Sequence, residues 1–339
     1  MVAGSESLDL SSSPNWYPLK VGTDGVSLVR LSEHDYAAAS FLDERLLQRH
    51  PSTVTLATEN VSAAGAKLPA RAYYLFHLGH VGSTLISRLI GAHPSAFCLR
   101  EPALLRAYVQ SLPFPSGSLP LRPLLALLAR TWRRDQIAVI KATSFVNEIA
   151  ARILAESGAP HALLICASPL AYLRGILGGP NSRIEARALA ADRLRRLSLQ
   201  FPQSDWGILP RSEGEWIASS WLCEMSALDD LSRRCPAITH WLDFDSFLRE
   251  PAAGLAAILG AFGVAYEAAQ VESIVTSPVM QQYSKAPEHS YDAALRRAVL
   301  EAADWEHGTE IRQGMRWLEA HARRDDSIQR VIATRRFVD

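Results

Sequence analysis

A glycine-containing loop is the part of this sequence whose residue types most clearly suggest chemistry. A short apolar run, Ala72–His77, leads into it, and a helical pattern follows it. Glycines let successive backbone N–H groups turn inward, and the start of a helix adds unpaired donors and a positive dipole end. Such a loop binds a phosphate or a similar oxyanion, although a tight strand-to-helix turn with an N-capping hydroxyl would read the same way. The residues expected to contact the anion are Gly79, His80, Val81, Gly82, Ser83 and Thr84.

The loop differs from the Walker A motif of ATP-hydrolysing proteins. That motif requires a lysine after its last glycine, and Ser83 occupies this position. No aspartate at the end of a second predicted strand offers itself as a Mg²⁺ ligand. ATP hydrolysis is therefore disfavoured.

Lys141 ends the apolar run Ile137–Lys141, which is predicted to be a strand. In open α/β sheets ligands bind at the carboxyl ends of parallel strands. Lys141 is therefore a candidate ligand for an anion, and a solvent-exposed lysine at a strand end is the alternative.

Short apolar runs alternate with helical stretches from residue 72 onwards, which is typical of βα units around a largely parallel sheet. The predicted strands are Ala72–His77, Ile137–Lys141, Ala162–Ala167 and Ile238–Phe244. The predicted helices are Ser83–Ala92, Leu121–Arg133, Phe145–Ser157, Pro169–Leu177, Ile184–Leu199, Glu213–Arg234, Ala252–Phe262, Tyr291–Ala303 and Thr309–Arg323. Helical spacing also covers Tyr36–Arg49. We expect an α/β, three-layer P-loop-type fold with a mainly parallel central sheet and a largely helical C-terminal third.

The composition narrows the class of protein. Of 339 residues 48% are hydrophobic, and 35 basic side chains balance 35 acidic ones. This excludes a disordered chain and argues against a nucleic-acid partner. The four cysteines show no CxxC spacing, so reduced thiols in a cytoplasmic protein are expected. No apolar run approaches the roughly 18 residues of a membrane span, and the first residues do not resemble a secretory signal.

The loop resembles the 5′-phosphosulfate loop of sulfotransferases that use 3′-phosphoadenosine-5′-phosphosulfate (PAPS). The matching residues are Gly82, Ser83, Thr84, Leu85, His93 and Pro94. Gly79 replaces a proline of the family motif, and His80 replaces its basic residue. A second matching segment contains Phe244, Asp245, Phe247, Pro251, Leu255, Phe262 and Gly263. The resemblance is greatest to the bacterial branch related to tyrosylprotein sulfotransferases.

The resemblance implies transfer of a sulfuryl group from PAPS to a hydroxyl or amine acceptor, in line and without a metal ion. Adenosine 3′,5′-bisphosphate would be the product. Glu101 lies where the related enzymes carry a catalytic carboxylate, and Lys141 aligns with a lysine that contacts the leaving phosphate. The implied organisation is an N-terminal extension (1–70, partly disordered), a sulfotransferase-like domain (71–325) and a C-terminal tail (326–339).

The sequence departs from the family where the 3′-phosphate is bound. Ala167 and Gly175 stand at the positions of the family's arginine and serine. Arg174 could reach the same phosphate, and Ser284 and Lys285 could supply further oxyanion ligands. The departure leaves two alternatives open: a nucleotide-dependent phosphotransferase on the same scaffold, or a non-catalytic descendant that binds a nucleotide or a partner.

The acceptor and the oligomeric state are not specified by the sequence. Segments Ser111–Pro123 and Asn181–Leu189 are expected to be loops that shape the acceptor pocket. The arginines between Arg183 and Arg196 are expected to form a solvated helix face, with a cleft that attracts an acidic acceptor as the alternative.

Overall fold

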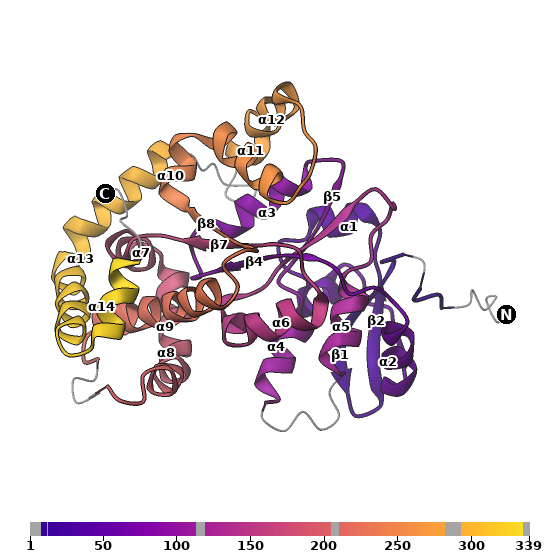
Figure 1. Cartoon of the computed structure of the whole chain (residues 1–339), viewed down its shortest axis with the longest axis horizontal. Coiled ribbons are helices and arrows are strands. Elements are labelled where there is room, and N and C mark those ends of the chain that lie inside the picture. Colours follow the sequence, from indigo (N-terminus) through magenta and orange to yellow (C-terminus); the bar gives the residue numbers. More distant parts are fainter. Residues whose placement is uncertain (1–7, 12, 113–118, 205–209, 282–292, 335–339) are drawn as a thin grey trace. The chain divides into compact units, whose positions relative to one another are not determined.

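A computed structural model describes residues 8–11, 13–112, 119–204, 210–281 and 293–334 (Figure 1). The chain divides into two compact units. The first unit consists of Met1–Phe76, Thr84–Leu163 and Leu255–Val279. The second consists of His77–Ser83, Leu164–Gly254 and Met280–Asp339.

A three-stranded antiparallel sheet opens the first unit. Its strands, in the order β1-β2-β3, are β1 (Trp16–Gly22), β2 (Gly25–Arg30) and β3 (Thr53–Leu56). This sheet lies within the N-terminal extension and was not predicted from the sequence. The expected boundary at residue 70 stays a prediction.

The helix predicted over residues 36–49 is wrong as a single element. The structure has α1 (Glu33–Ala38) and a separate 3₁₀ helix, η1 (Glu44–Gln48). Between them Leu42 bonds to another segment, because its N–H donates to Arg100 O at 2.8 Å and its carbonyl accepts from Ala103 N–H at 3.0 Å. These bonds replace the ones that would continue the helix.

Five further strands form one sheet in the order β5-β6-β4-β7-β8. They are β4 (Tyr73–His77), β5 (Ala96–Arg100), β6 (Ile137–Lys141), β7 (Ala162–Cys166) and β8 (Thr239–Asp243). In the first unit β6 pairs in parallel with both β4 and β5. β4, β5 and β7 are buried along their whole length, and apart from the terminal His77 and Arg100 their residues are apolar, as is typical of strands covered on both faces.

Helices account for most of the remaining described chain (Figure 1). Those before residue 160 are α2 (Thr58–Ala66), α3 (Ser83–Gly91), α4 (Ala103–Gln110), α5 (Leu121–Leu128), η2 (Ser144–Ile149) and α6 (Ala150–Ser157). The later ones are α7 (Pro169–Leu177), α8 (Pro180–Gln200), α9 (Glu213–Arg234), α10 (Phe244–Arg249), α11 (Pro251–Ala261), α12 (Ala268–Val275), η3 (Pro278–Gln281), α13 (Ala293–Ala322) and α14 (Asp326–Ala333).

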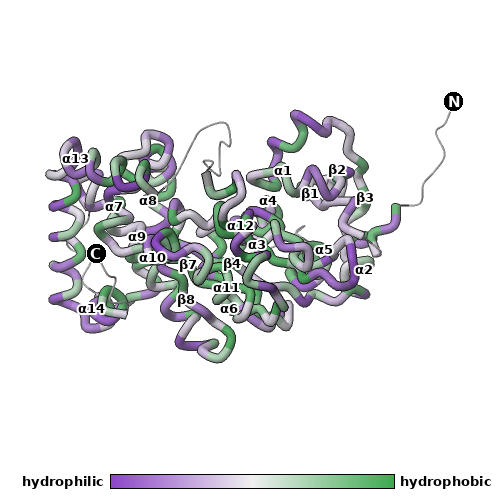
Figure 2. Tube along the Cα trace, turned by 90° about the horizontal axis from the view of Figure 1, so that it is seen from above, coloured by the Kyte–Doolittle hydropathy of each residue, from purple (hydrophilic) through white to green (hydrophobic). Residues whose placement is uncertain are grey.

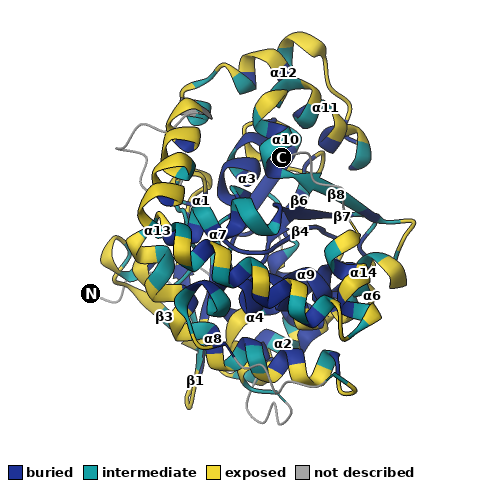
Figure 3. Ribbon diagram, turned by 90° about the vertical axis from the view of Figure 1, so that its left-hand side faces the viewer, coloured by how far each residue is buried: buried dark blue, intermediate teal, exposed yellow. Residues whose placement is uncertain are grey.

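In the second unit α9 is the central helix. It is buried along most of its length, and α8, α13, α7 and α14 all pack against it (Figure 3). Along α13 hydrophilic and hydrophobic residues alternate, as expected of a helix with one solvent-facing side (Figure 2). A non-helical residue, His307, divides α13 near the junction predicted between two helices.

The predicted α/β fold, with a mainly parallel sheet and a helical C-terminal third, is confirmed. Strand β5 (Ala96–Arg100) was not predicted. Helix α14 occupies much of the segment expected to be a tail. Within the described ranges no helix is long and apolar enough to span a membrane.

Candidate functional site

Three residues of the predicted anion-binding loop have left-handed backbone. Gly79, His80 and Gly82 all have positive φ, at 85°, 54° and 67°. The Gly79 N–H donates to His77 Nδ1 at 2.9 Å, which fixes the start of the turn. A non-glycine residue at positive φ is uncommon, and such conformations concentrate at functional sites.

Two features favour glycine at position 82: its positive φ and the close approach of the Phe244 ring. A Cβ at this position would lie 1.9 Å from the ring of Phe244, the first residue of α10. This close approach ties the loop to the segment that supplied the second family resemblance. No larger residue fits without moving the ring.

The hydroxyl groups at the start of α3 are buried. Ser83 and Thr84 are 4% and 3% exposed. Within the described part of the chain Thr84 Oγ1 has no hydrogen-bond partner. A buried hydroxyl without a partner costs free energy, and an anion bound at the start of α3 could accept its hydrogen bond.

His80 is held by two side chains of α8. Its Nδ1 lies 3.0 Å from Ser182 Oγ, and its Nε2 lies 3.1 Å from Glu185 Oε2. The His80 side chain is 15% exposed. Neither partner was predicted from the sequence, because both lie about a hundred residues downstream of His80.

The loop is also anchored from α7. The Tyr172 hydroxyl donates to Leu78 O at 3.4 Å. Burial raises the pKa of Tyr172 to about 12, so the phenol keeps the proton that it donates. Burial lowers the pKa of the nearby Arg193 guanidinium, but the negative charge of Glu224 contributes to a net rise.

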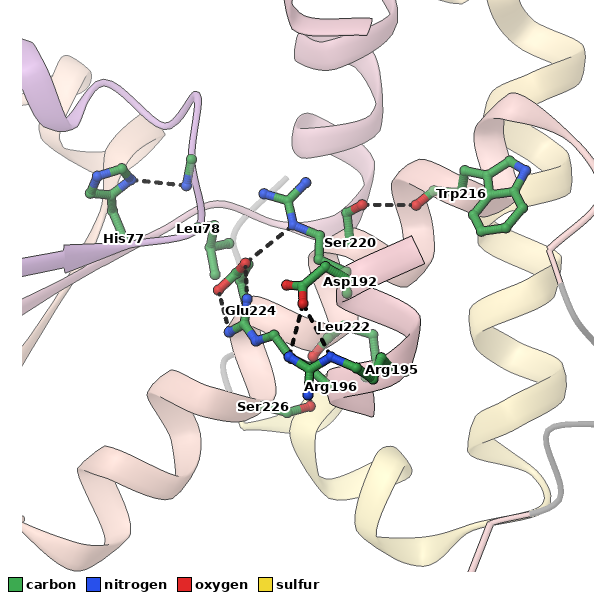
Figure 4. A network of polar contacts seen from close by, with 12 residues as sticks. His77, Leu78, Asp192, Arg195, Arg196, Trp216, Ser220, Leu222, Glu224 and Ser226 are labelled. Carbon is green, nitrogen blue, oxygen red and sulfur yellow. Dashed lines mark hydrogen bonds and ion pairs between the residues drawn. The ribbon is translucent and has the colours of Figure 1, made fainter. Parts of the chain in front are cut away.

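Glu224 of α9 accepts hydrogen bonds from two arginines of α8 (Figure 4). Arg193 Nε lies 3.2 Å from Oε1, and Arg196 donates to both carboxylate oxygens at 2.9 and 3.1 Å. The side chains are 4%, 2% and 0% exposed. The expectation of a solvated arginine face is therefore wrong for these two residues.

The other compact unit brings Glu101 and Lys141 together. β5 and β6 place Arg100 opposite Lys141, and the Glu101 N–H donates to Lys141 O at 2.8 Å. The Lys141 ammonium donates to Glu101 Oε1. Lys141 is 1% exposed at its side chain and Glu101 is 14% exposed. Glu101 has a φ of 50°, so the candidate base and His80 are both non-glycine residues in the left-handed region.

Arg100 does not pair with the candidate base. Its guanidinium donates to the carbonyls of Tyr36, Ala37 and Ala39 at the end of α1. Burial lowers the pKa of Arg100 to about 10. Phe41, in the segment after α1, has the Arg45 guanidinium 3.8 Å and the Lys141 ammonium 6.0 Å from its ring centre.

The residues at and beside the positions where the family binds the 3′-phosphate make other contacts in this chain. The Ala167 carbonyl accepts from Trp221 Nε1 at 3.0 Å. Arg174 donates through Nε to Asp304 of α13 at 2.7 Å, with side chains 30% and 43% exposed. A Cβ at Gly175 would meet no atom within 4 Å, so a larger residue would fit there.

Two other expectations concern segments around the site. Asn181–Leu189 was expected to be a loop and instead lies within α8, where Pro180 occupies the first turn. Residues 113–118 of the other expected loop lie outside the described residues. The same is true of Ser284 and Lys285.

Comparisons with known proteins found similarity to solved structures alone. No family model matches the chain, and no curated protein matches it. Similar solved structures include mouse sulfotransferase SULT7A1 complexed with PAP, at 10% identity and a TM-score of 0.43, covering 84% of this chain and 97% of that one.

Two bacterial structures are also similar. The sulfotransferase domain from the curacin biosynthetic pathway is 11% identical, with a TM-score of 0.42 and coverage of 79% of this chain and 98% of that one. The sulfotransferase from Alicyclobacillus acidocaldarius is 13% identical, with a TM-score of 0.36 and coverage of 77% and 99%.

Proposed function

We propose that this chain is a sulfotransferase that transfers a sulfuryl group from PAPS to a hydroxyl or amine acceptor. The observation that carries the proposal is the loop from Gly79 to Thr84. It combines left-handed backbone at Gly79, His80 and Gly82 with a buried hydroxyl that has no partner in the described chain. The donor would supply an activated sulfuryl group attached to a phosphate, and the loop would bind that anionic end.

The loop binds the donor with its backbone N–H groups and with the hydroxyls of Ser83 and Thr84. Ser83 and Thr84 begin α3, where N–H groups lack partners within the helix. His80 stands where the family has a stronger cation, so the imidazole is the side chain that meets the transferring group. A sulfuryl group carries less charge than a phosphoryl group, so amide dipoles and single cations can stabilise it without a metal ion.

We assign Glu101 as the base that takes the acceptor proton, and Lys141 as the cation that stabilises the leaving phosphate. Because Glu101 and Lys141 form an ion pair, we expect Lys141 to bind the donor before Glu101 acts as the base. A carboxylate bound to an ammonium is a weaker base than a free one, and an incoming anion competes for that ammonium. Donor binding would therefore release Glu101 for the acceptor.

Recognition of the 3′-phosphate is assigned to Arg174, because Ala167 and Gly175 provide no charge. Its bond to Asp304 is partly exposed, so a phosphate can replace the carboxylate at modest cost. Ser284 and Lys285 remain proposed as further ligands.

The Thr84→Val variant tests the loop directly. Valine keeps the shape and removes a buried hydroxyl without a partner, so the free protein should keep its stability or gain up to about 1 kcal/mol. Loss of one hydrogen bond to the ligand should weaken adenosine 3′,5′-bisphosphate binding about tenfold, or about 1.4 kcal/mol. Denaturant unfolding and calorimetry measure the two effects.

The matched control is Thr276→Val at the end of α12, whose hydroxyl already bonds to Glu272 O. This control should leave bisphosphate affinity unchanged. Unchanged affinity in Thr84→Val as well would remove this hydroxyl from the donor site.

A further inference from the structure

Ser182, His80 and Glu185 have the connectivity of an activated serine nucleophile. A nucleophile, a base and a group that orients the base each lie within hydrogen-bond reach of the next. Here Ser182 Oγ is 3.0 Å from Nδ1 of His80, and Nε2 is 3.1 Å from Glu185 Oε2. With hydrogen on Nε2, the ring donates to Glu185 and accepts from the Ser182 hydroxyl. All three residues belong to the second unit.

Local structure places the serine for this role. Ser182 lies in the first turn of α8, three residues before Glu185, so both side chains project from the same side of the helix. Gly179 makes room for the hydroxyl, because a Cβ there would lie 2.9 Å from Ser182 Oγ. The left-handed backbone of His80 turns its ring towards both partners.

The surroundings also suit a developing negative charge. The first backbone bond within α8 is donated by Arg183 N–H to Gly179 O. The amides of Asn181 and Ser182 precede it, so they have no acceptor within the helix. Amides at the positive end of a helix stabilise an oxyanion formed beside the nucleophile.

We infer that Ser182, His80 and Glu185 give this chain a second activity, the hydrolysis of small carboxylic esters through an acyl-serine. His80 Nδ1 takes the Ser182 proton as Oγ bonds to the ester carbonyl carbon. The carbon–alkoxy bond then breaks, and the alcohol leaves with that proton. Water adds to the acyl group, passes a proton through His80, and releases the acid and free Ser182. The inference goes beyond sulfuryl transfer and does not depend on it.

A fluorophosphonate probe tests the nucleophile, because it phosphonylates an activated serine and releases fluoride. The full-length protein is incubated with the probe, and the labelled peptide is mapped by mass spectrometry. We expect labelling of Ser182, none in Ser182→Ala, and about 10²-fold slower labelling in His80→Asn. Asparagine suits the left-handed backbone at position 80, so this variant removes the base while retaining the turn.

The matched control is Ser198→Ala, another serine of α8 whose hydroxyl bonds to Arg195 O. It should label at the wild-type rate. Thermal melting establishes that each variant is folded. An unlabelled Ser182 in the folded wild type, or equal rates in wild type and His80→Asn, would overturn the inference.

Hydrolysis of p-nitrophenyl acetate gives a second readout. Ser182→Ala should lower kcat/KM by at least about 10²-fold, and Glu185→Gln by about tenfold because Glu185 orients the base without accepting the serine proton. Wild-type hydrolysis by Ser182→Ala would overturn the inference. The result does not depend on whether the chain binds PAPS, since no nucleotide is present.

Discussion

Two glutamates of this chain bind buried cations, but their surroundings differ. Glu224 is 0% exposed and joins two helices through Arg193 and Arg196. Glu101 follows a strand with φ at 50°, is 14% exposed, and accepts a hydrogen bond from the ammonium of Lys141. The first carboxylate is enclosed by its guanidinium partners, whereas the second retains access to other groups.

The difference separates a structural use of charge from a chemical one. Breaking a buried ion pair is costly because it leaves a charge without compensation. Where one partner still reaches solvent or a ligand, breaking the ion pair costs less free energy, and the charged side chain can bind a substrate instead. We therefore expect the Glu224 cluster to determine stability and the Glu101–Lys141 pair to determine turnover.

The largest effect on stability is expected from Glu224→Gln. It leaves two buried guanidiniums facing a neutral amide, which should cost about 3–5 kcal/mol of unfolding free energy. Denaturant unfolding measures this loss. The control is Glu319→Gln, since the Glu319 pair with Arg323 is exposed on both sides and should contribute less than about 1 kcal/mol. A loss at Glu224 no larger than at Glu319 would contradict the structural role.

Lys141→Met should have a smaller effect on folding and a large one on chemistry. Because Glu101 is partly exposed, the stability loss should be about 1–3 kcal/mol. Conversion of PAPS to adenosine 3′,5′-bisphosphate should fall by about 10²-fold or more when the cation on the leaving phosphate is lost.

Adding Glu101→Gln to Lys141→Met should recover part of the stability, because it removes the charge that faced Lys141, and none of the turnover, because it also removes the proposed base. Two results would remove the distinction between the two clusters. One is a stability loss in Lys141→Met that equals that of Glu224→Gln, and the other is unchanged turnover.

The smallest effect on stability is expected for the ion pair of Arg174 and Asp304, because both side chains are more exposed than those of the two buried pairs. Asp304→Asn should change the unfolding free energy by less than about 0.5 kcal/mol. If Arg174 binds the 3′-phosphate, freeing its guanidinium should tighten bisphosphate binding several-fold while leaving ADP binding unchanged. Equal effects on both nucleotides would argue against this assignment.

The sequence identified the parts of the fold and site that are local in the chain. The loop, the strand that enters it and the end of β6 at Lys141 were all predicted from neighbouring residue types. The partners of His80 were not, because Ser182 and Glu185 meet it only after α8 forms. The break between α1 and η1 was missed for a similar reason, since Leu42 exchanges helix bonds for bonds to the chain around β5.

Calorimetry of adenosine 3′,5′-bisphosphate and ADP, each with and without Mg²⁺, tests the central claim most directly. We predict that the bisphosphate binds at least tenfold more tightly, or by about 1.4 kcal/mol, and that Mg²⁺ has no effect. That result would mean that the 3′-phosphate is recognised despite Ala167 and Gly175. Equal or tighter binding of ADP, increased by Mg²⁺, would contradict a PAPS-dependent sulfotransferase.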